Sequence, residues 1–177
     1  MNTFLKNYLT KASYCLATGF LLGTAFTGSA NALTQTGNIA VSASVVAACS
    51  ITVAPVPFGP YTGSAITRDV SNGVSVTCTN GAPYNIGLSA GGGSGATVIT
   101  RKLTGSGTAA ANTLTYSLYK DSGYVNIWGN TTGNDTQAGT GNGAAQSYTV
   151  YGKMNALGAQ TLATGSYSDT VIATITY

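Results

Sequence analysis

The stretch VSVTCTNGAPYNIGLSA, residues 74–90, decides the fold. Its first part alternates apolar residues with Ser and Thr as far as Cys78, and its second part resumes an alternation from Tyr84 to Leu88. Asn80-Gly81 lies between the two parts, and this dipeptide is typical of a tight turn. A side-chain period of two belongs to strands that bury one face. The stretch therefore predicts two β-strands.

The same alternation recurs along the rest of the chain. Further strands are predicted at 39–45, 51–53, 114–119, 123–128, 148–153 and 167–177, the last as one long closing strand. Gly-rich segments at 91–95 and 129–143 separate them as loops. We find no helical periodicity after residue 33. About seven short strands with frequent turns predict an all-β, antiparallel β-sandwich with one domain.

The first 32 residues have the layout of a secretory signal peptide. Lys6 and Lys11 precede an apolar run at 14–26, and Ala30-Asn31-Ala32 offers a small-residue cleavage site. The alternative is an uncleaved anchor, for which the apolar run is short. We expect cleavage after Ala32, so that residues 33–177 form the exported chain.

The composition excludes several functions. Charged residues make up only 6% of the chain, and His and Glu are absent. Five basic residues face four Asp after residue 32, which gives no basic footprint for nucleic acid. A Ser-His-Asp or Cys-His arrangement cannot be built without His, and the four Asp are better explained as turn residues than as a glycosidase pair. We therefore expect no enzyme, no cofactor and no metal.

The cysteines indicate a disulfide. Cys15 lies in the predicted leader, which leaves Cys49 and Cys78 as an even pair in an exported chain. Two cysteines cannot form a zinc site without further ligands. We expect Cys49 and Cys78 to be joined on neighbouring strands.

The segment before Cys49 has two explanations. From Asn38 to Val53 there is no Gly, Pro or Asx turn signal, so the segment cannot easily turn back to pair with the strand it continues into. Its first half has an apolar face (Ile39, Val41, Ala43, Val45) and a small polar face. Either it is an ordinary first strand, or its apolar face is buried in another molecule. The pattern alone leaves both open.

Several motifs together resemble the spore coat protein U-like family, which includes pilins of archaic chaperone–usher pili. The matching motifs are VSVTCTNG (74–81), Pro83-Tyr84 with LSAGG (88–92), LTYSLYKD (114–121), Trp128-Gly129, Gln146 with TVYG (149–152), and GSYSDTV (165–171) running on to Tyr177. They keep the family's order over essentially all of residues 33–177.

The resemblance implies an incomplete immunoglobulin-like sandwich that is completed by donor-strand exchange. A periplasmic chaperone would fill the gap first, and another subunit's N-terminal segment would replace it at an outer-membrane usher. Residues 33–47 would then be the donor segment, centred on Thr36 to Ala47, and 48–177 the pilin domain. The residues implied for each role are Ile39, Val41, Ala43 and Val45 in the donor strand, and Val171, Ala173, Ile175 and Tyr177 at the edge that receives chaperone or donor.

The implied function is that of a structural subunit of a surface pilus, with a part in adhesion or biofilm formation. A donor segment in a single-domain chain indicates a shaft subunit rather than a tip adhesin. Two alternatives remain open, a secreted monomeric module that binds carbohydrate or surfaces through exposed Tyr and Trp128, and a protective coat component. For the aromatic residues, packing in the core is the better-motivated role.

Overall fold

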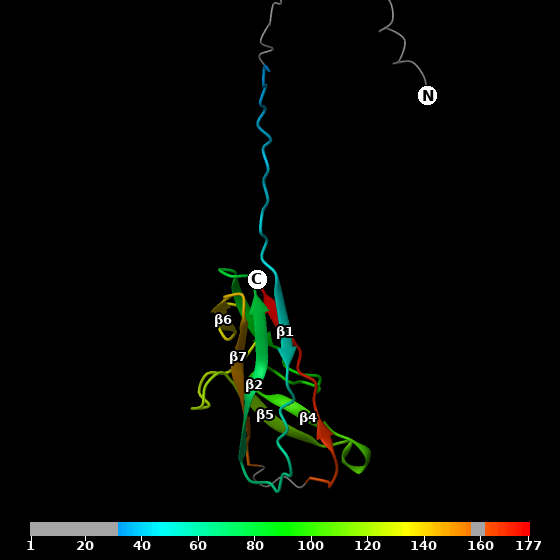
Figure 1. Cartoon of the computed structure of the whole chain (residues 1–177). Helices are drawn as coiled ribbons and strands as arrows, with labels where there is room; N and C mark the ends of the chain where they lie inside the picture. The colour runs from blue at the N-terminus through cyan, green and yellow to red at the C-terminus, as the bar shows by residue number, and fades with distance from the viewer. Residues whose placement is uncertain (1–31, 157–161) are drawn as a thin grey trace, which may run out of the picture. The chain divides into compact units, whose positions relative to one another are not determined.

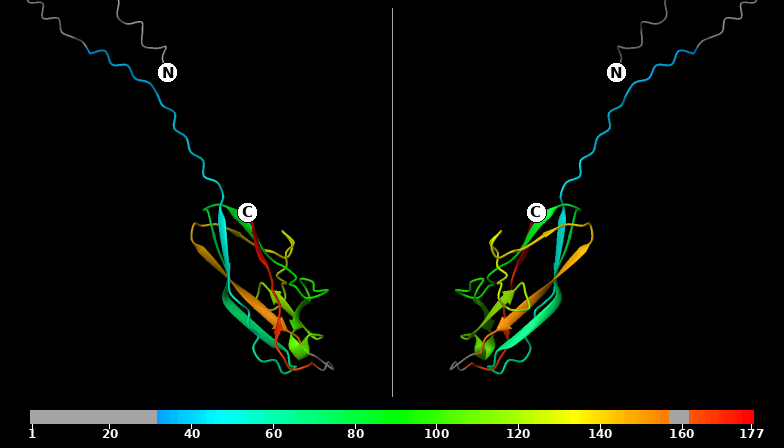
Figure 2. Two further views of the ribbon diagram at one scale, coloured as in Figure 1. Left: turned by 90° about the vertical axis from the view of Figure 1, so that its right-hand side faces the viewer. Right: turned by 90° about the vertical axis from the view of Figure 1, so that its left-hand side faces the viewer.

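The computed structural model describes residues 32–156 and 162–177, and at 70–72 only the backbone. The predicted leader lies outside these residues, apart from Ala32. The chain divides into two units, Met1–Ser42 and Ala43–Tyr177. Every strand among the described residues belongs to the second unit, whose strands are seen in Figures 1 and 2.

Six strands form the larger sheet, in which every pairing is antiparallel. In spatial order they are β1 (Cys49–Val53), β2 (Ile66–Cys78), β7 (Ala145–Met154), β5 (Thr113–Tyr119), β4 (Arg101–Gly105) and β8 (Tyr167–Ser168). β2 is the longest, and its register with β7 shifts between Val70 and Val74. Such an irregularity bends a strand locally.

The smaller sheet contains β6 (Gln137–Thr140), β3 (Pro83–Leu88) and β9 (Ala173–Thr176), in that order. β2 and β3 are consecutive but lie in different sheets. The Asn80-Gly81 turn therefore passes the chain from one sheet to the other instead of closing a hairpin. Gly81 has φ 82°, a left-handed conformation that glycine adopts without strain.

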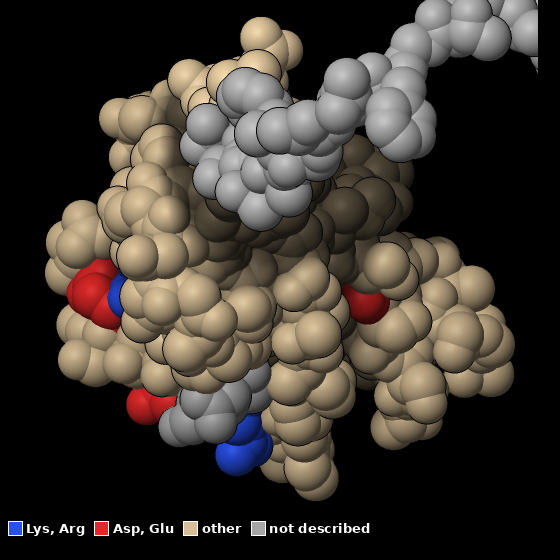
Figure 3. Space-filling model, turned by 45° about the horizontal axis from the view of Figure 1, so that its top comes forward, with Lys and Arg blue, Asp and Glu red and all other residues tan. Residues whose placement is uncertain are grey.

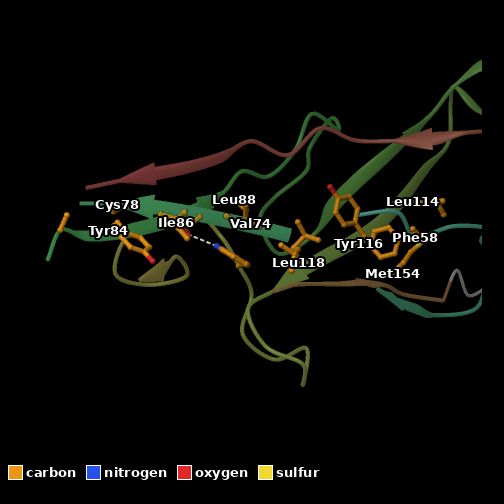
Figure 4. Close-up of a cluster of buried hydrophobic side chains, with 14 residues drawn as sticks. Phe58, Val74, Cys78, Tyr84, Ile86, Leu88, Leu114, Tyr116, Leu118 and Met154 are labelled. Atoms are coloured by element: carbon orange, nitrogen blue, oxygen red, sulfur yellow. Dashed lines mark hydrogen bonds between the residues drawn. The ribbon is translucent and has the colours of Figure 1, made fainter. Parts of the chain in front are cut away.

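The core lies between the two sheets, and Figure 4 shows its length. Cys78, Tyr84 and Ile86 lie at one end, whereas Phe58, Leu114 and Met154 lie at the other. Trp128 is 1% exposed and donates its indole N–H to the Ile86 carbonyl at 2.9 Å. Its role is core packing, so the alternative in which Trp128 forms part of a sugar-binding surface is wrong.

The all-β sandwich predicted from the alternation is confirmed, but the expected strand at 123–128 is wrong. Only an isolated bridge joins Tyr119 to Ile127 there. The Asp121 carboxylate accepts hydrogen bonds from the backbone N–H groups of Gly123, Val125 and Asn126, which winds the segment into a turn. Tyr124 in this turn has φ 54°. Apolar alternation could not reveal a turn that is fixed by one side chain.

The long closing strand expected at 167–177 is also wrong. The chain forms two short strands, β8 and β9, which belong to different sheets. The crossing between them, residues 169–172, is anchored to Ser89, whose N–H donates to the Ile172 carbonyl and whose hydroxyl accepts from the Ile172 N–H. The passage from one sheet to the other interrupts a run that looks continuous in sequence.

Three strand segments were not predicted. They are the first half of β2, all of β4 and all of β6. β4 and β6 are rich in Gly, Thr and polar residues, so their places in the sheets depend on pairing with β5 and β3 rather than on an apolar pattern. The only helical element in the described residues is a short 3₁₀ turn, Gly107–Ala109.

Candidate functional site: an open groove between the sheets

The two sheets are not joined along the side where β1 and β9 lie. Cα atoms of these strands approach within 8 Å, and Figures 1 and 2 show them side by side, yet no ladder connects them among the described residues. Each is the terminal strand of its own sheet. The sandwich therefore has two unpaired strand edges facing one gap.

The hydrogen-bond pattern shows which groups β9 directs into that gap. The Ser89 N–H donates to the Ile172 carbonyl at 2.9 Å, so this opposed pair is of the hydrogen-bonded type. Pairs alternate along an antiparallel ladder, and Leu88 is the Cα partner of Ala173. The N–H and C=O groups of Ala173 and Ile175 therefore point away from β3, toward the open edge.

The same reasoning applies to β1. The Thr79 N–H donates to the Ala48 carbonyl and the Ala54 N–H to the Gly73 carbonyl, each at 2.9 Å. These bonds face β2, so the alternate residues Cys49, Ile51 and Val53 present their backbone groups to the other side. Each edge thus has backbone donors and acceptors that no strand among the described residues pairs.

A groove of about 1520 Å³ opens in the half of the sandwich away from the disulfide. One rim is the segment 53–64 and the other is the segment 162–171 together with Ala173. Its floor consists of core side chains from five strands: Val74, Leu88, Leu103, Leu114, Tyr116, Leu118, Val150 and Met154. An apolar floor beneath two separated rims is what a sandwich lacking a strand would leave.

Proline keeps the first rim out of any ladder. Pro55, Pro57 and Pro60 lie within the segment that follows β1, and proline has no N–H to donate. The rim is instead anchored by side chains, since Arg68 donates to the Phe58 carbonyl at 2.9 Å and Tyr61 to the Asn155 carbonyl at 2.5 Å. The apolar alternation of the sequence did not predict this rim.

Tyr116 contacts both rims from the floor. Its hydroxyl donates to Asp169 Oδ2 at 2.6 Å, and its ring stands edge-on to Phe58 with the ring centroids 5.7 Å apart. Burial, together with the Asp169 carboxylate, raises the pKa of the Tyr116 hydroxyl above its ordinary value, so the hydroxyl keeps its proton. Asp169 also accepts from the N–H groups of Gly92 and Thr170, each at 2.7 Å.

Arg101 links β4 to the backbone of neighbouring segments. It is fully buried on β4 and donates to four backbone carbonyls, at Leu88, Ser89, Val98 and Trp128, over 2.8–3.0 Å. Burial lowers the pKa of its guanidinium from the ordinary value. The five-donor fork of arginine suits such a set of converging carbonyls. No pattern in the sequence indicates that this arginine is internal.

The proposed donor residues precede β1. Residues 32–48 form no strand and every one of them is exposed, including Ile39 at 88%, Val41 at 90% and Val45 at 87%. Large β-branched side chains on a polar chain are rarely left so accessible. In the edge set, Val171, Ala173 and Ile175 are half-buried against the core, whereas Tyr177 is 58% exposed.

Cys49 and Cys78 form a disulfide between directly opposed residues of β1 and β2, as the sequence predicted. The bond joins the first residue of β1 to the last residue of β2. It therefore ties the start of β1 covalently to the end of β2.

The surface is nearly devoid of charge. On the face that Figure 3 shows, acidic and basic side chains are few and form no large patch of one sign. No cluster of His, Cys, Asp and Glu within the described ranges could hold a metal ion. In the same ranges there is no helix whose length and apolar character would let it cross a membrane.

The fold and the groove together define an antiparallel β-sandwich with an open strand position. The family model of the Spore Coat Protein U domain matches residues 35–174, and the chain belongs to that family. Protein U of Myxococcus xanthus is 35% identical over 162 residues, covering 84% of this chain and 88% of that protein.

A solved structure shares the fold. It is a chain from the CsuC–CsuE chaperone–tip adhesion subunit pre-assembly complex of the archaic chaperone-usher Csu pili of Acinetobacter baumannii, with 21% identity and a TM-score of 0.53. The match covers 75% of this chain and 40% of that chain, so this chain corresponds to less than half of its solved neighbour.

Proposed function

We propose that the chain is a structural subunit of a chaperone–usher surface pilus and that it polymerises by donor-strand complementation. The observation that carries this proposal is the open side of the sandwich, where an apolar groove meets the unpaired edges of β1 and β9 at Val53 and Ala173. A sandwich of this kind gains stability when an extended segment adds to the edge and buries alternate side chains. In this reading residues 48–177 are the pilin domain.

The occupant we assign is the 33–47 segment of a second copy or of a related subunit. Its apolar residues Ile39, Val41, Ala43 and Val45 recur every second position, which matches one face of an added strand. Burying the three larger ones at ~1.5–3 kcal/mol each would supply roughly 5–8 kcal/mol. Nearly uncharged surfaces offer little repulsion between copies.

Export, partners and biological role follow from the same proposal. Residues 1–32 direct the chain to the periplasm, where a chaperone occupies the groove before an outer-membrane usher exchanges it for the next subunit. The edge residues Val171, Ala173, Ile175 and Tyr177 meet the chaperone first and the donor strand afterwards. The assembled fibre would serve adhesion or biofilm formation at the cell surface.

The test replaces Val41 with Asp and compares it with Ser42→Asp. Val41 lies in the middle of the apolar face, so a carboxylate there would enter the neighbour's groove without a partner, at a cost of several kcal/mol. Ser42 points to the opposite face of the same strand. In cells that carry the native assembly genes, Val41→Asp should abolish heat-resistant ladders on gels and fibres in electron micrographs. Ser42→Asp should leave most assembly intact.

Two outcomes would reject the donor assignment. One is normal polymerisation of the Val41→Asp chain. The other is equal damage from both substitutions to folding of the isolated chain, which would make 36–47 an ordinary internal strand.

A second candidate function is that of a protective coat component. It is favoured by the 35% identity to Protein U and by the name of the family. It would use the same groove and strand exchange but form a layer rather than a fibre. Electron microscopy of the assembled material distinguishes the two.

A further inference from the structure

Tyr116 and Asp169 form a contact between the groove's floor and one of its rims. Tyr116 is 5% exposed on β5, and its hydroxyl donates to Asp169 Oδ2 at 2.6 Å. Its ring simultaneously packs edge-on against Phe58 of the opposite rim, with centroids 5.7 Å apart. The Tyr116 side chain therefore contacts both rims of the groove at once.

Asp169 is built for this contact. Its two oxygens accept three hydrogen bonds, from Tyr116 and from the N–H groups of Gly92 and Thr170. Gly91 has φ 87°, and a Cβ at that residue would collide with the Asp169 carboxylate. The 91–95 loop thus leaves room for the carboxylate, which explains a glycine-rich segment that the sequence indicated only as a flexible connection.

Beyond β8, the rim crosses from one sheet to the other. Residues 169–172 cross between the two sheets, and β8 before them has only two residues. The crossing is otherwise attached through Ser89, which bonds Ile172. Without the tyrosine hydroxyl, the Asp169 side chain would no longer be tied to the floor of the groove, and the backbone around it would be held by the pairing of Ser168 with Thr104 and by the 91–95 loop.

We propose that Tyr116 and Asp169 are positioning residues that hold the groove at the width of a strand and thereby set the rate at which it accepts a donor segment. This inference rests on the proposed function. A rim held in one position is preorganised, whereas a rim that samples several positions accepts a strand only from the competent fraction. The contact involves the floor and rim but not the donor, so it acts mainly before the strand is bound.

The test measures incorporation of a fluorescent peptide with the sequence of residues 33–47 into the mature chain as it refolds. Tyr116→Phe removes one oxygen and keeps the ring against Phe58. The matched control is Tyr148→Phe, because Tyr148 and Tyr84 share a comparable hydroxyl–hydroxyl bond of 2.6 Å outside the groove lining. Asp169→Ala removes the same contact from the rim side.

Tyr116→Phe and Asp169→Ala should each slow peptide association about five- to tenfold, as expected if the competent fraction falls by that factor. The double variant should be no slower than the slower single variant, because both changes remove one contact. Dissociation should change less than twofold, and Tyr148→Phe should associate at the wild-type rate.

Equal association rates for wild type and Tyr116→Phe would overturn the positioning role and leave the proposed function standing. Equal slowing by Tyr148→Phe would also overturn it, since a general loss of stability would then explain the effect. If the wild-type chain took up no peptide, the strand-acceptor function itself would fail and this inference with it.

Discussion

Supplying the missing strand within one chain should stabilise the sandwich strongly. The change is a deletion of residues 33–47 from the N-terminus and their addition after Tyr177 through a short Gly- and Asn-containing loop. β9 ends one residue before the C-terminus, and a strand antiparallel to β9 needs only a tight loop to reach its open edge. Ala173 and Ile175 would bond it on that side.

The size of the effect follows from the buried side chains. Ile39, Val41 and Val45 are 88%, 90% and 87% exposed in the chain, so nearly all of their surface would be removed from water. The apolar gain is roughly 5–8 kcal/mol, and ordering the added backbone opposes it. If about half of the apolar contribution remains after this cost, the free energy of unfolding rises by ~3–4 kcal/mol. For a domain of this size, that raises the Tm on the order of 10 °C.

The assay compares thermal unfolding of the fused chain with that of the chain lacking 33–47. The chain without the segment should aggregate or melt at low temperature, because its groove and strand edges stay open. A fused chain carrying Val41→Asp in the added strand is the matched control and should lose most of the gain. A stable, cooperatively unfolding chain without residues 33–47, or equal stabilisation by the Val41→Asp strand, would refute the incomplete sandwich.

Two further predictions concern the scaffold and are measured in the fused chain. Arg101→Met should lower the free energy of unfolding by about 3–5 kcal/mol, because it leaves buried carbonyls without a donor. A loss below about 1 kcal/mol in denaturant titrations would contradict a stabilising role for these Arg101 hydrogen bonds. Hydrogen bonds from the backbone, led by that from Asn126, lower the pKa of Asp121 below its ordinary value. Its contribution is therefore present above pH ~4 and lost as pH falls through the folded-state pKa, so Asp121→Asn should flatten the acid side of the stability profile. An unchanged acid side would show that the turn does not depend on this carboxylate.

The sequence predicted those parts of the fold in which side-chain pattern alone decides structure. β3 and β5 alternate cleanly and were found, and the disulfide followed from two cysteines in an exported chain. β4 and β6 were missed because polar, glycine-rich strands form only against a partner. The segment 123–128 was misassigned because Asp121 supplies a local alternative to a ladder.

The groove could be predicted from the sequence only in part, for a different reason. Buried floor residues such as Leu114 and Met154 look like any core residue in sequence, because their alternation is the same whether or not the strand above them belongs to the chain. The rims depend on long-range contacts, Tyr116 with Asp169 and Arg68 with Phe58, that no periodicity encodes.

The N-terminal segment could be an ordinary first strand or a segment buried in another molecule. The fold around it bears on this choice more than its own sequence pattern does. An ordinary first strand would share a ladder with a neighbour, yet β1 begins at Cys49, and residues 32–48 are exposed throughout. Meanwhile β1 and β9 each direct backbone groups at a gap that no described strand fills. Unpaired strand edges and exposed β-branched side chains are each unfavourable in water, and one extended segment entering another copy's groove removes both. A monomer would leave both uncorrected, which supports the proposed exchange between chains.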